Sequence, residues 1–108
     1  MNIGSSIKSI RCKLGMLQSE LAEKCELSQT ALSQIETGKK RPNPRTLTRI
    51  CAALDVPTSI IYIIAMEEID VPVTKKATYD LVFPSIKALA LQMVDSTHRS
   101  LLEMEETV

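Results

Sequence analysis

Aromatic side chains are scarce in this chain of 108 residues, where they make up 3% of the sequence and include no Trp. Apolar residues nevertheless amount to 44%. A core must therefore be built from Ile, Leu, Val, Met and Ala, a composition that suits a compact helical bundle. A chain of this length can bury such a core and forms one domain, or one small domain with an appendage.

Side chains suited to catalysis or metal binding are also few. The one histidine, His98, lies beside Asp95 and Arg99 and is interpreted as a solvated residue. No Ser/His/Asp or Cys/His arrangement, glycine-rich loop or pair of carboxylates stands out. The three cysteines are an odd number without metal-ligand spacing, and they fit core thiols in a reducing cytosol. We therefore expect no enzyme activity, no metal and no cofactor.

Membrane and secretion signals are absent from the sequence as well. No charged-then-apolar leader is present, and no apolar run approaches the roughly 18 residues that a membrane span needs. We expect a soluble, cytoplasmic protein that does not bind a membrane.

The chain as a whole lacks an excess of charge of either sign, but its two parts carry opposite net charges. Residues 1–66 hold nine Lys and Arg against five Asp and Glu, a net charge of +4. Residues 67–108 hold four bases against eight acids, a net charge of −4. A basic surface is the electrostatic signature of a nucleic-acid-binding protein, so the first part is the candidate for that role.

The stretch from Gln18 to Glu36 has the spacing of two short helices joined by a tight turn. Its apolar pairs lie four and three residues apart, so that each pair shares one helix face. These positions are Leu21 with Cys25, Leu32 with Ile35, and Leu27 in the turn between them. Ala22 is small enough for the second helix to cross closely, Ser28 is a good N-cap, and Gly38 can end a helix.

On these residues, the chain from Ile7 to Met66 resembles DNA-binding domains of the lambda-repressor and Cro type, the XRE family. The motifs that carry the resemblance are Gln18 with Leu21-Ala22, the segment Leu27 to Glu36, and Thr37-Gly38-Lys39-Lys40-Arg41-Pro42. The resemblance implies an all-α fold, a five-helix DNA-binding domain whose third helix reads bases. In this chain a C-terminal helical extension would follow it.

The helical pattern divides the chain into three parts. Residues 1–66 form the helix-turn-helix domain, with helices expected at 5–14, 18–25, 29–37, 44–54 and 58–66. In residues 67–84 two proline-interrupted, β-leaning pieces flank a polar TKKA, which predicts a linker or a weak hairpin. A helical stripe returns from Ser85, so that residues 85–108 are expected to form a C-terminal helix for dimerisation or packing.

The second helix of the pair carries a polar outward face. Its outward residues are Gln29, Thr30, Ser33 and Gln34. They lie toward the helix N-terminus, the end that meets base edges when such helices dock in the major groove. Gln can pair with adenine through two hydrogen bonds, and Thr offers a hydroxyl and a methyl group. The base-reading positions of the family map onto Gln29, Thr30 and Gln34.

A second set of residues is expected to contact phosphates, which position the protein without reading sequence. These are Gln18 in the first turn of its helix and, after the recognition helix, Thr37, Lys39, Lys40 and Arg41. Arg41 has an alternative role, which is to enter the minor groove. The resemblance further implies that Arg11 and Glu36 form an ion pair that ties the first helix to the third and reads no base.

The sequence departs from the family pattern at three positions. Leu17 replaces the usual polar N-cap of the second helix, at a cost of about 1 kcal/mol. Glu26 and Asp55 stand where glycine is frequent, which implies strain if their φ angles are positive.

A single recognition helix reads few base pairs, and proteins of this type dimerise across half-sites one helical turn apart. We expect a homodimer whose interface draws on surplus apolar residues. The candidates are Ile60, Ile61, Ile64, Ile86, Met93 and Leu101. The alternative is that the tail folds back onto the fifth helix of its own chain. The two arrangements are compatible if tails are exchanged between protomers.

Together these observations predict a sequence-specific regulator of transcription that binds double-stranded DNA, most simply as a dimeric repressor on a palindromic operator. The alternative is an antitoxin-like protein that binds a protein partner through its acidic, apolar tail and autoregulates its operon. The operator sequence, any inducer and the direction of regulation do not follow from the residues.

Overall fold

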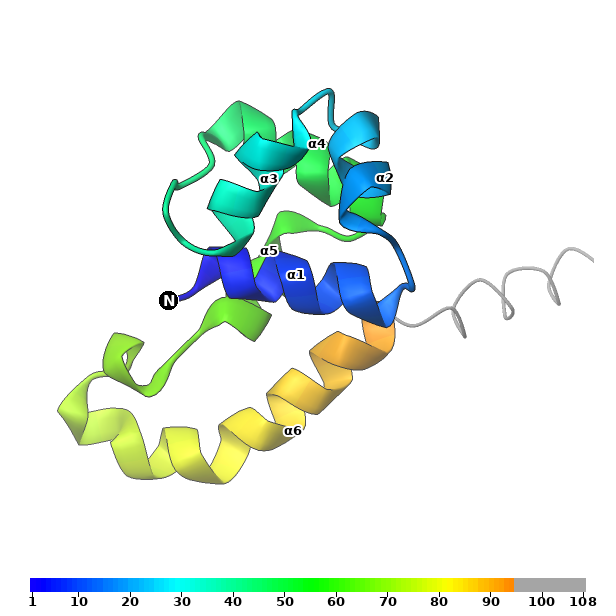
Figure 1. Cartoon of the computed structure of the whole chain (residues 1–108). Coiled ribbons are helices and arrows are strands. Elements are labelled where there is room, and N and C mark those ends of the chain that lie inside the picture. Colours follow the sequence, from blue (N-terminus) through cyan, green and yellow to red (C-terminus); the bar gives the residue numbers. More distant parts are fainter. Residues whose placement is uncertain (95–108) are drawn as a thin grey trace, which may run out of the picture.

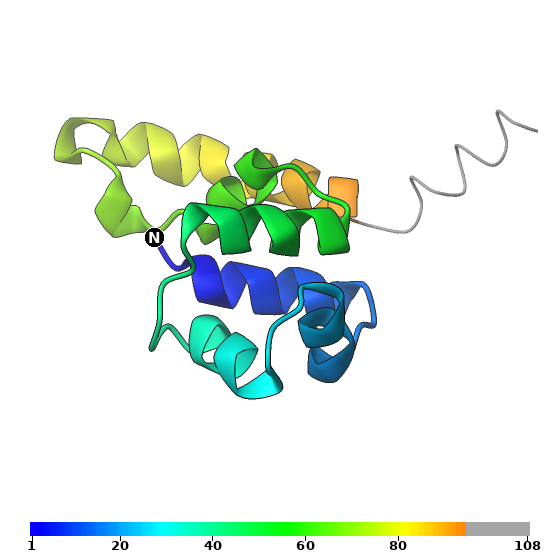
Figure 2. The same ribbon diagram turned by 90° about the horizontal axis from the view of Figure 1, so that it is seen from above.

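Six α-helices and two short 3-10 helices make up the computed structural model, which describes residues 1–94 (Figures 1 and 2). The helices are α1 (Ile3–Lys13), α2 (Gln18–Lys24), α3 (Gln29–Glu36), α4 (Pro44–Leu54), α5 (Thr58–Ala65) and α6 (Lys76–Val94). The 3-10 helices η1 (Glu68–Asp70) and η2 (Val73–Lys75) lie between α5 and α6. No strand occurs within the described range, and the prediction of an all-α fold is confirmed.

Polar caps determine where three of the helices begin. The side chains of Asn2, Ser28 and Asn43 accept hydrogen bonds from backbone N–H groups three residues on, at 3.0, 3.0 and 2.8 Å. Pro44 follows Asn43 at a position where its missing N–H costs nothing. Because Asn2 caps α1, that helix begins at Ile3, two residues before the expected start.

The core is aliphatic, as the composition predicts, and α1 lies at its centre. The largest side chains that are almost completely buried are Ile7, Ile10, Leu21, Leu32, Ile50, Leu54, Ile61 and Cys25. The hydroxyl of Ser6 on α1 donates to the carbonyl of Ile61 on α5 at 2.9 Å. Cys25 and Cys51 are buried, but Cys12 is exposed, so the interpretation of all three as core thiols is wrong for Cys12.

One glycine is essential to this packing. Gly4 lies in the first turn of α1, where α1 meets α3, and a Cβ at this position would collide with the carbonyl oxygen of Ile35. The two helix backbones can approach this closely only because glycine has no side chain.

Residues 67–84 do not form the expected linker or weak hairpin. They contain η1, η2 and the first half of α6, which begins at Lys76 and continues through Pro84. A proline inside a helix costs about 3 kcal/mol, which is why the sequence favoured a helix starting after it. Contacts between α6 and α5 oppose this local preference, and within α6 the rings of Tyr79 and Phe83, four residues apart, stack on each other at 4.6 Å.

The described part of the C-terminal extension, up to Val94, packs against its own chain in this structure. Helix α6 lies across α5 and one end of α1, on the side of the molecule away from α2 and α3 (Figures 1 and 2). Ala90 and Val94 on α6 join the core. Figure 1 also shows that the N-terminal half of α6 diverges from the rest of the bundle.

Three of the residues expected at a dimer interface are part of this core. Ile60, Ile61 and Ile64 are 5%, 0% and 8% exposed, which leaves no surface for a second chain to contact. Their assignment to a dimer interface is therefore wrong for this conformation, because the core and α6 already cover the surplus isoleucines of α5. Ile86 and Met93 are exposed, and Leu101 lies outside the described residues.

Within residues 1–94, no helix is by itself long and apolar enough to cross a membrane. The pair α4 and α5 meets the criterion of length and composition only when joined across a bend of 98°.

Candidate nucleic-acid interface

Helix α3 presents its predicted base-reading residues on one side. Its N-terminus is capped by Ser28, while Leu32 and Ile35 are buried against α1 and α2. On the opposite side Gln29 and Thr30 are exposed, and Ser33 and Gln34 are half-buried. The four polar side chains thus share the accessible face of α3, in the order that the sequence predicts.

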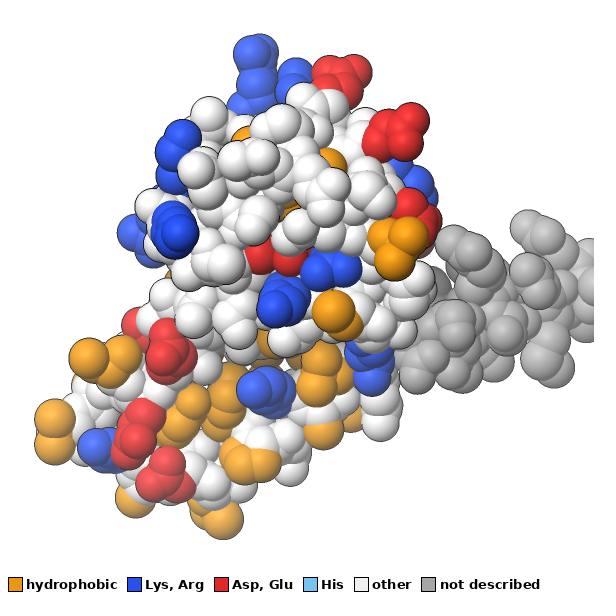
Figure 3. Space-filling view, in the orientation of Figure 1, with side chains coloured by type: hydrophobic (Ala, Val, Ile, Leu, Met, Phe, Trp, Pro, Cys, Tyr) orange, Lys and Arg blue, Asp and Glu red, His pale blue; other side chains and the backbone are white. Residues whose placement is uncertain are grey.

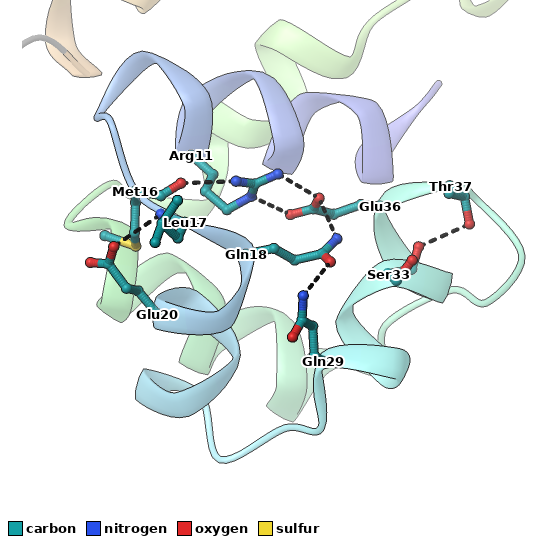
Figure 4. Close-up of polar contacts among 9 residues, drawn as sticks. All are labelled: Arg11, Met16, Leu17, Gln18, Glu20, Gln29, Ser33, Glu36 and Thr37. Carbon is teal, nitrogen blue, oxygen red and sulfur yellow. Dashed lines mark hydrogen bonds and ion pairs between the residues drawn. The ribbon is translucent and has the colours of Figure 1, made fainter.

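An ion pair lies directly behind this face. Arg11 on α1 donates from Nε and from one terminal nitrogen to the two carboxylate oxygens of Glu36, at 2.8 and 3.0 Å (Figure 4). Its other terminal nitrogen donates to the carbonyl of Met16 at 2.8 Å. The geometry is the two-point pairing that a planar guanidinium makes with a carboxylate. The predicted contact between Arg11 and Glu36 is present.

Burial makes this ion pair sensitive to the loss of either partner. The side chain of Glu36 is 1% exposed and that of Arg11 is 10% exposed. Hydrogen bonding to Glu36 is the main cause that raises the pKa of Arg11 above its ordinary value, against an opposing contribution from burial. The guanidinium is therefore charged at every pH at which the fold is expected to exist. Removing one partner of such a pair costs about 3–5 kcal/mol.

Two glutamines connect this ion pair to the outward face of α3. The Nε2 group of Gln18, the first residue of α2, donates to Glu36 at 3.1 Å. The Oε1 atom of Gln18 accepts from Nε2 of Gln29, the first residue of α3, at 3.3 Å (Figure 4). A continuous chain of polar contacts thus runs from Arg11 through Glu36 and Gln18 to Gln29.

This chain of contacts orients the Gln29 amide before any ligand arrives. The contact with Gln18 uses one N–H of Gln29 and leaves its Oε1 and its other N–H unused. An acceptor and a donor side by side are what the N6 and N7 atoms of adenine require. A side chain that is already oriented loses less conformational freedom on binding.

The sequence did not reveal the Gln18–Gln29 contact. The sequence shows that each helix of the pair begins with glutamine. It does not show how close the N-termini of the two helices lie to each other. The crossing of α2 and α3 brings the two first residues together.

The predicted phosphate-contacting residues differ in how available they are. Lys39, Lys40 and Arg41 are exposed in the loop after α3, and within residues 1–94 none of them forms an ion pair. The hydroxyl of Thr37 already donates to the carbonyl of Ser33 at 2.9 Å, so it must rotate before it can donate to a phosphate. Gln18 is half-buried and has one N–H left to offer.

The three departures from the family pattern have visible consequences. Glu26 and Asp55 adopt φ angles of 57° and 56°, in the left-handed region that favours glycine. Leu17 has no side-chain oxygen with which to cap α2. The carboxylate of Glu20 accepts from the backbone N–H of Leu17 at 3.3 Å, which satisfies one of the groups at this helix end.

The fold and this polar face define the class of the protein. Residues 7–61 match the helix-turn-helix family, and the chain belongs to this family of DNA-binding domains. The resemblance to the lambda-repressor and Cro type, first seen in the segment Gln18 to Glu36, is thereby confirmed.

Individual relatives share this part of the chain. It is 34% identical over 65 residues to the transcriptional regulator ClgR of Mycobacterium tuberculosis, covering 60% of this chain and 58% of ClgR. It is 38% identical over 61 residues to the immunity repressor protein of Bacillus phage phi105, covering 56% of this chain and 42% of the repressor. The ImmF control region 10 kDa protein of the same phage is 32% identical over 59 residues, with 55% and 66% covered. The chain thus spans between two fifths and two thirds of the length of these relatives.

Proposed function

We propose that the protein is a sequence-specific regulator of transcription, and that it acts as a homodimeric repressor on a palindromic operator. The observation that carries the proposal is the exposed polar face of α3, held in place by the contacts from Gln18 and Glu36. The relatives support it, since one is named a transcriptional regulator and another an immunity repressor.

In this proposal α3 enters the major groove of double-stranded DNA. Gln29, Thr30, Ser33 and Gln34 contact base edges there, and one good two-point contact gives about 1–3 kcal/mol of discrimination between bases. Lys39, Lys40 and Arg41 reach the phosphates beside the groove, which fixes the register of α3 without reading sequence. Repression then follows from occupying DNA that the transcription machinery needs.

The charge of the protein supports this assignment. The net charge of +4 on residues 1–66 favours approach to DNA, whereas the described part of the extension, residues 67–94, holds three bases against four acids. The excess of basic residues therefore lies in the part that carries α3.

Selection of binding sites from a random duplex pool at about 150 mM salt tests the proposal, because weak non-specific binding is suppressed there. The expected result is enrichment of an inverted repeat with half-site centres about one helical turn apart. A variant with Gln29→Ala and Gln34→Ala should enrich no such repeat.

Gln92→Ala, which removes an exposed amide from α6, is the matched control and should enrich the same repeat as the wild type. Failure of the wild type to enrich any sequence would overturn the proposal. It would favour instead an antitoxin-like role, in which a protein partner binds the extension.

A further inference from the structure

Helix α6 has a row of apolar side chains that the other described residues, 1–75, leave exposed. Val82, Ile86, Leu89 and Met93 are 41%, 42%, 62% and 59% exposed. They recur at intervals of four, three and four residues, so they form one continuous row along the helix, here called the α6 row. The row lies beside, and not on, the side of α6 that contributes Ala90 and Val94 to the core.

An apolar groove adjoins the N-terminal half of the α6 row. It has a volume of about 300 Å³ and lies between α6 and the segment from α5 to η2. Ile63, Met66, Val71, Tyr79 and Phe83 line it, together with Val82 and Ile86 of the row. Figure 3 shows the exposed apolar side chains gathered over α6 and beside it, below the more polar surface of the helix-turn-helix. Contiguous apolar surface of this kind marks a site of association.

We propose that the α6 row and this groove form the contact between two copies of the chain. The inference rests on the proposed function in one respect, since it names the surface through which the proposed homodimer forms. The proposed dimer contact uses exposed residues of α6 in place of the buried isoleucines of α5 that the sequence suggested.

The shape of the surface favours a second copy over a different partner. The groove lies beside Val82 and Ile86, whereas the most exposed residues of the row, Leu89 and Met93, lie at its other end. Two antiparallel α6 helices related by a two-fold axis between residues 87 and 88 set Leu89 of one copy opposite Ile86 of the other. The same axis sets Met93 opposite Val82. The projecting end of each row then meets the groove of the other copy, as a two-fold interface requires.

The charges around the surface point the same way. Of the described residues that line the groove, only Lys75 is charged. The row itself carries no charge, so it offers no complementary groups to DNA or to a strongly acidic or basic peptide. A second copy of the chain presents the same uncharged, apolar surface, which is complementary to the row.

The size of the surface suits a modest, reversible dimer. Helix α6 has 19 residues. At 1.5 Å per residue and about 10 Å across, such a helix has a footprint on the order of 300 Å². The row alone is smaller than the roughly 800 Å² per partner of a typical specific interface, and the groove walls on α5 and on the segment before α6 add to it. The contact lies on the opposite side of α1 from α2 and α3, so DNA can bind to the dimer (Figure 2).

The test is sedimentation equilibrium of the full chain of 12.0 kDa without DNA. Over about 1 to 300 μM, the range in which a modest dimer dissociates, the wild type should shift from one to two chains per particle. The variant Leu89→Gln/Met93→Gln should raise the dissociation constant at least about tenfold. The matched control Leu81→Gln/Leu17→Gln alters two residues that are 81% and 63% exposed but lie outside the row and the groove, and it should leave the constant unchanged.

Two results would overturn the inference. One is a wild type that stays monomeric at all concentrations, which would mean that another class of molecule covers the row. The other is an equal effect of the test variant and the control. Both variants change surface residues, and matching circular dichroism spectra check that they fold.

A DNA measurement separates this inference from the proposed function. Discrimination between duplexes that contain a single half-site depends on α3 alone. A chain that dimerises through the row but discriminates between no duplexes refutes the proposed function only. A chain that discriminates but never dimerises refutes the contact proposed here.

Discussion

The carboxylate of Glu36 accepts hydrogen bonds from two other helices at once. Arg11 binds it from α1 and Gln18 from α2, so that it holds the three helices at one point. Because Gln18 also contacts Gln29, the buried Glu36 helps to position a residue that is proposed to read a base. Under the proposed function, stability and recognition are therefore coupled at this point.

Glu36→Gln should lower the free energy of unfolding by about 3–5 kcal/mol, because it leaves the buried guanidinium of Arg11 without a counter-charge. The pKa of Arg11 is raised, so the contribution of the pair is fully present below the ordinary pKa of arginine and is lost only above the raised value. The loss on substitution should therefore be equal at pH 6 and pH 9. Urea denaturation measures it.

Glu26→Gln is the matched control. Glu26 lies 3.8 Å from Arg49 and its side chain is 80% exposed, so this change should cost less than about 1 kcal/mol. Equal losses for the two glutamates would contradict the role given to Glu36.

Gly4→Ala should destabilise the fold by about 1–3 kcal/mol, as insertion of a methyl group into a packed contact does. The added Cβ meets the backbone of α3 at Ile35, which cannot rotate away as a side chain would. Ser5→Ala, at an exposed position of the same helix turn, serves as the control and should change stability little. Thermal denaturation of both variants measures the difference in stability. An unchanged melting temperature for Gly4→Ala would refute the close contact between α1 and α3.

At the scale of elements, the turn between α2 and α3 combines a well-formed helix start with a strained residue. Ser28 caps α3, whereas Glu26 adopts a left-handed conformation. For a residue other than glycine that conformation costs about 1–2 kcal/mol.

Glu26→Gly should therefore raise the free energy of unfolding, by about 0.5 kcal/mol once the greater freedom of glycine in the unfolded chain is deducted. Glu23→Gly is the control inside α2, where glycine should lower it by about 1 kcal/mol. The two changes are chemically identical, and opposite signs in urea denaturation are the expected result. The same sign for both would show that Glu26 is not strained.

Much of this architecture could be predicted from the sequence, because it depends on local signals. The cap at Asn43, the apolar spacing from Leu21 to Ile35 and the charge of residues 1–66 identified the helix-turn-helix and its polar face. The Gln18–Gln29 contact and the packing at Gly4 were not predictable, since both depend on how helices cross. The start of α6 was misplaced because contacts with α5 outweigh the local effect of Pro84.

At the scale of the whole molecule, the two sides of α1 have different surfaces. Helices α2 and α3 and the basic loop lie on one side, and α6 with its exposed apolar row lies on the other (Figures 1 and 3). Under the two proposals above, this separation lets one side bind DNA while the other contacts a second chain.

Lys39→Gln/Lys40→Gln should weaken DNA binding and also reduce its dependence on salt. Each lost phosphate contact lowers the slope of log K against log salt by about 0.9, so the double variant should lose up to about 1.8. Lys76→Gln/Lys87→Gln removes two exposed lysines from α6, on the opposite side, and should leave the slope unchanged. Equal slopes for both variants would mean that the loop after α3 does not contact phosphates.

The central claim is that the outward face of α3 reads bases, and a panel of duplexes tests it most directly. Each duplex carries one substituted base pair of the selected half-site, and binding is measured for the wild type, Gln34→Ala and Lys39→Ala. We predict that Gln34→Ala abolishes about 1–3 kcal/mol of discrimination at one or two positions only, whereas Lys39→Ala weakens all duplexes equally. Uniform weakening by Gln34→Ala, or no effect at any position, would contradict the claim.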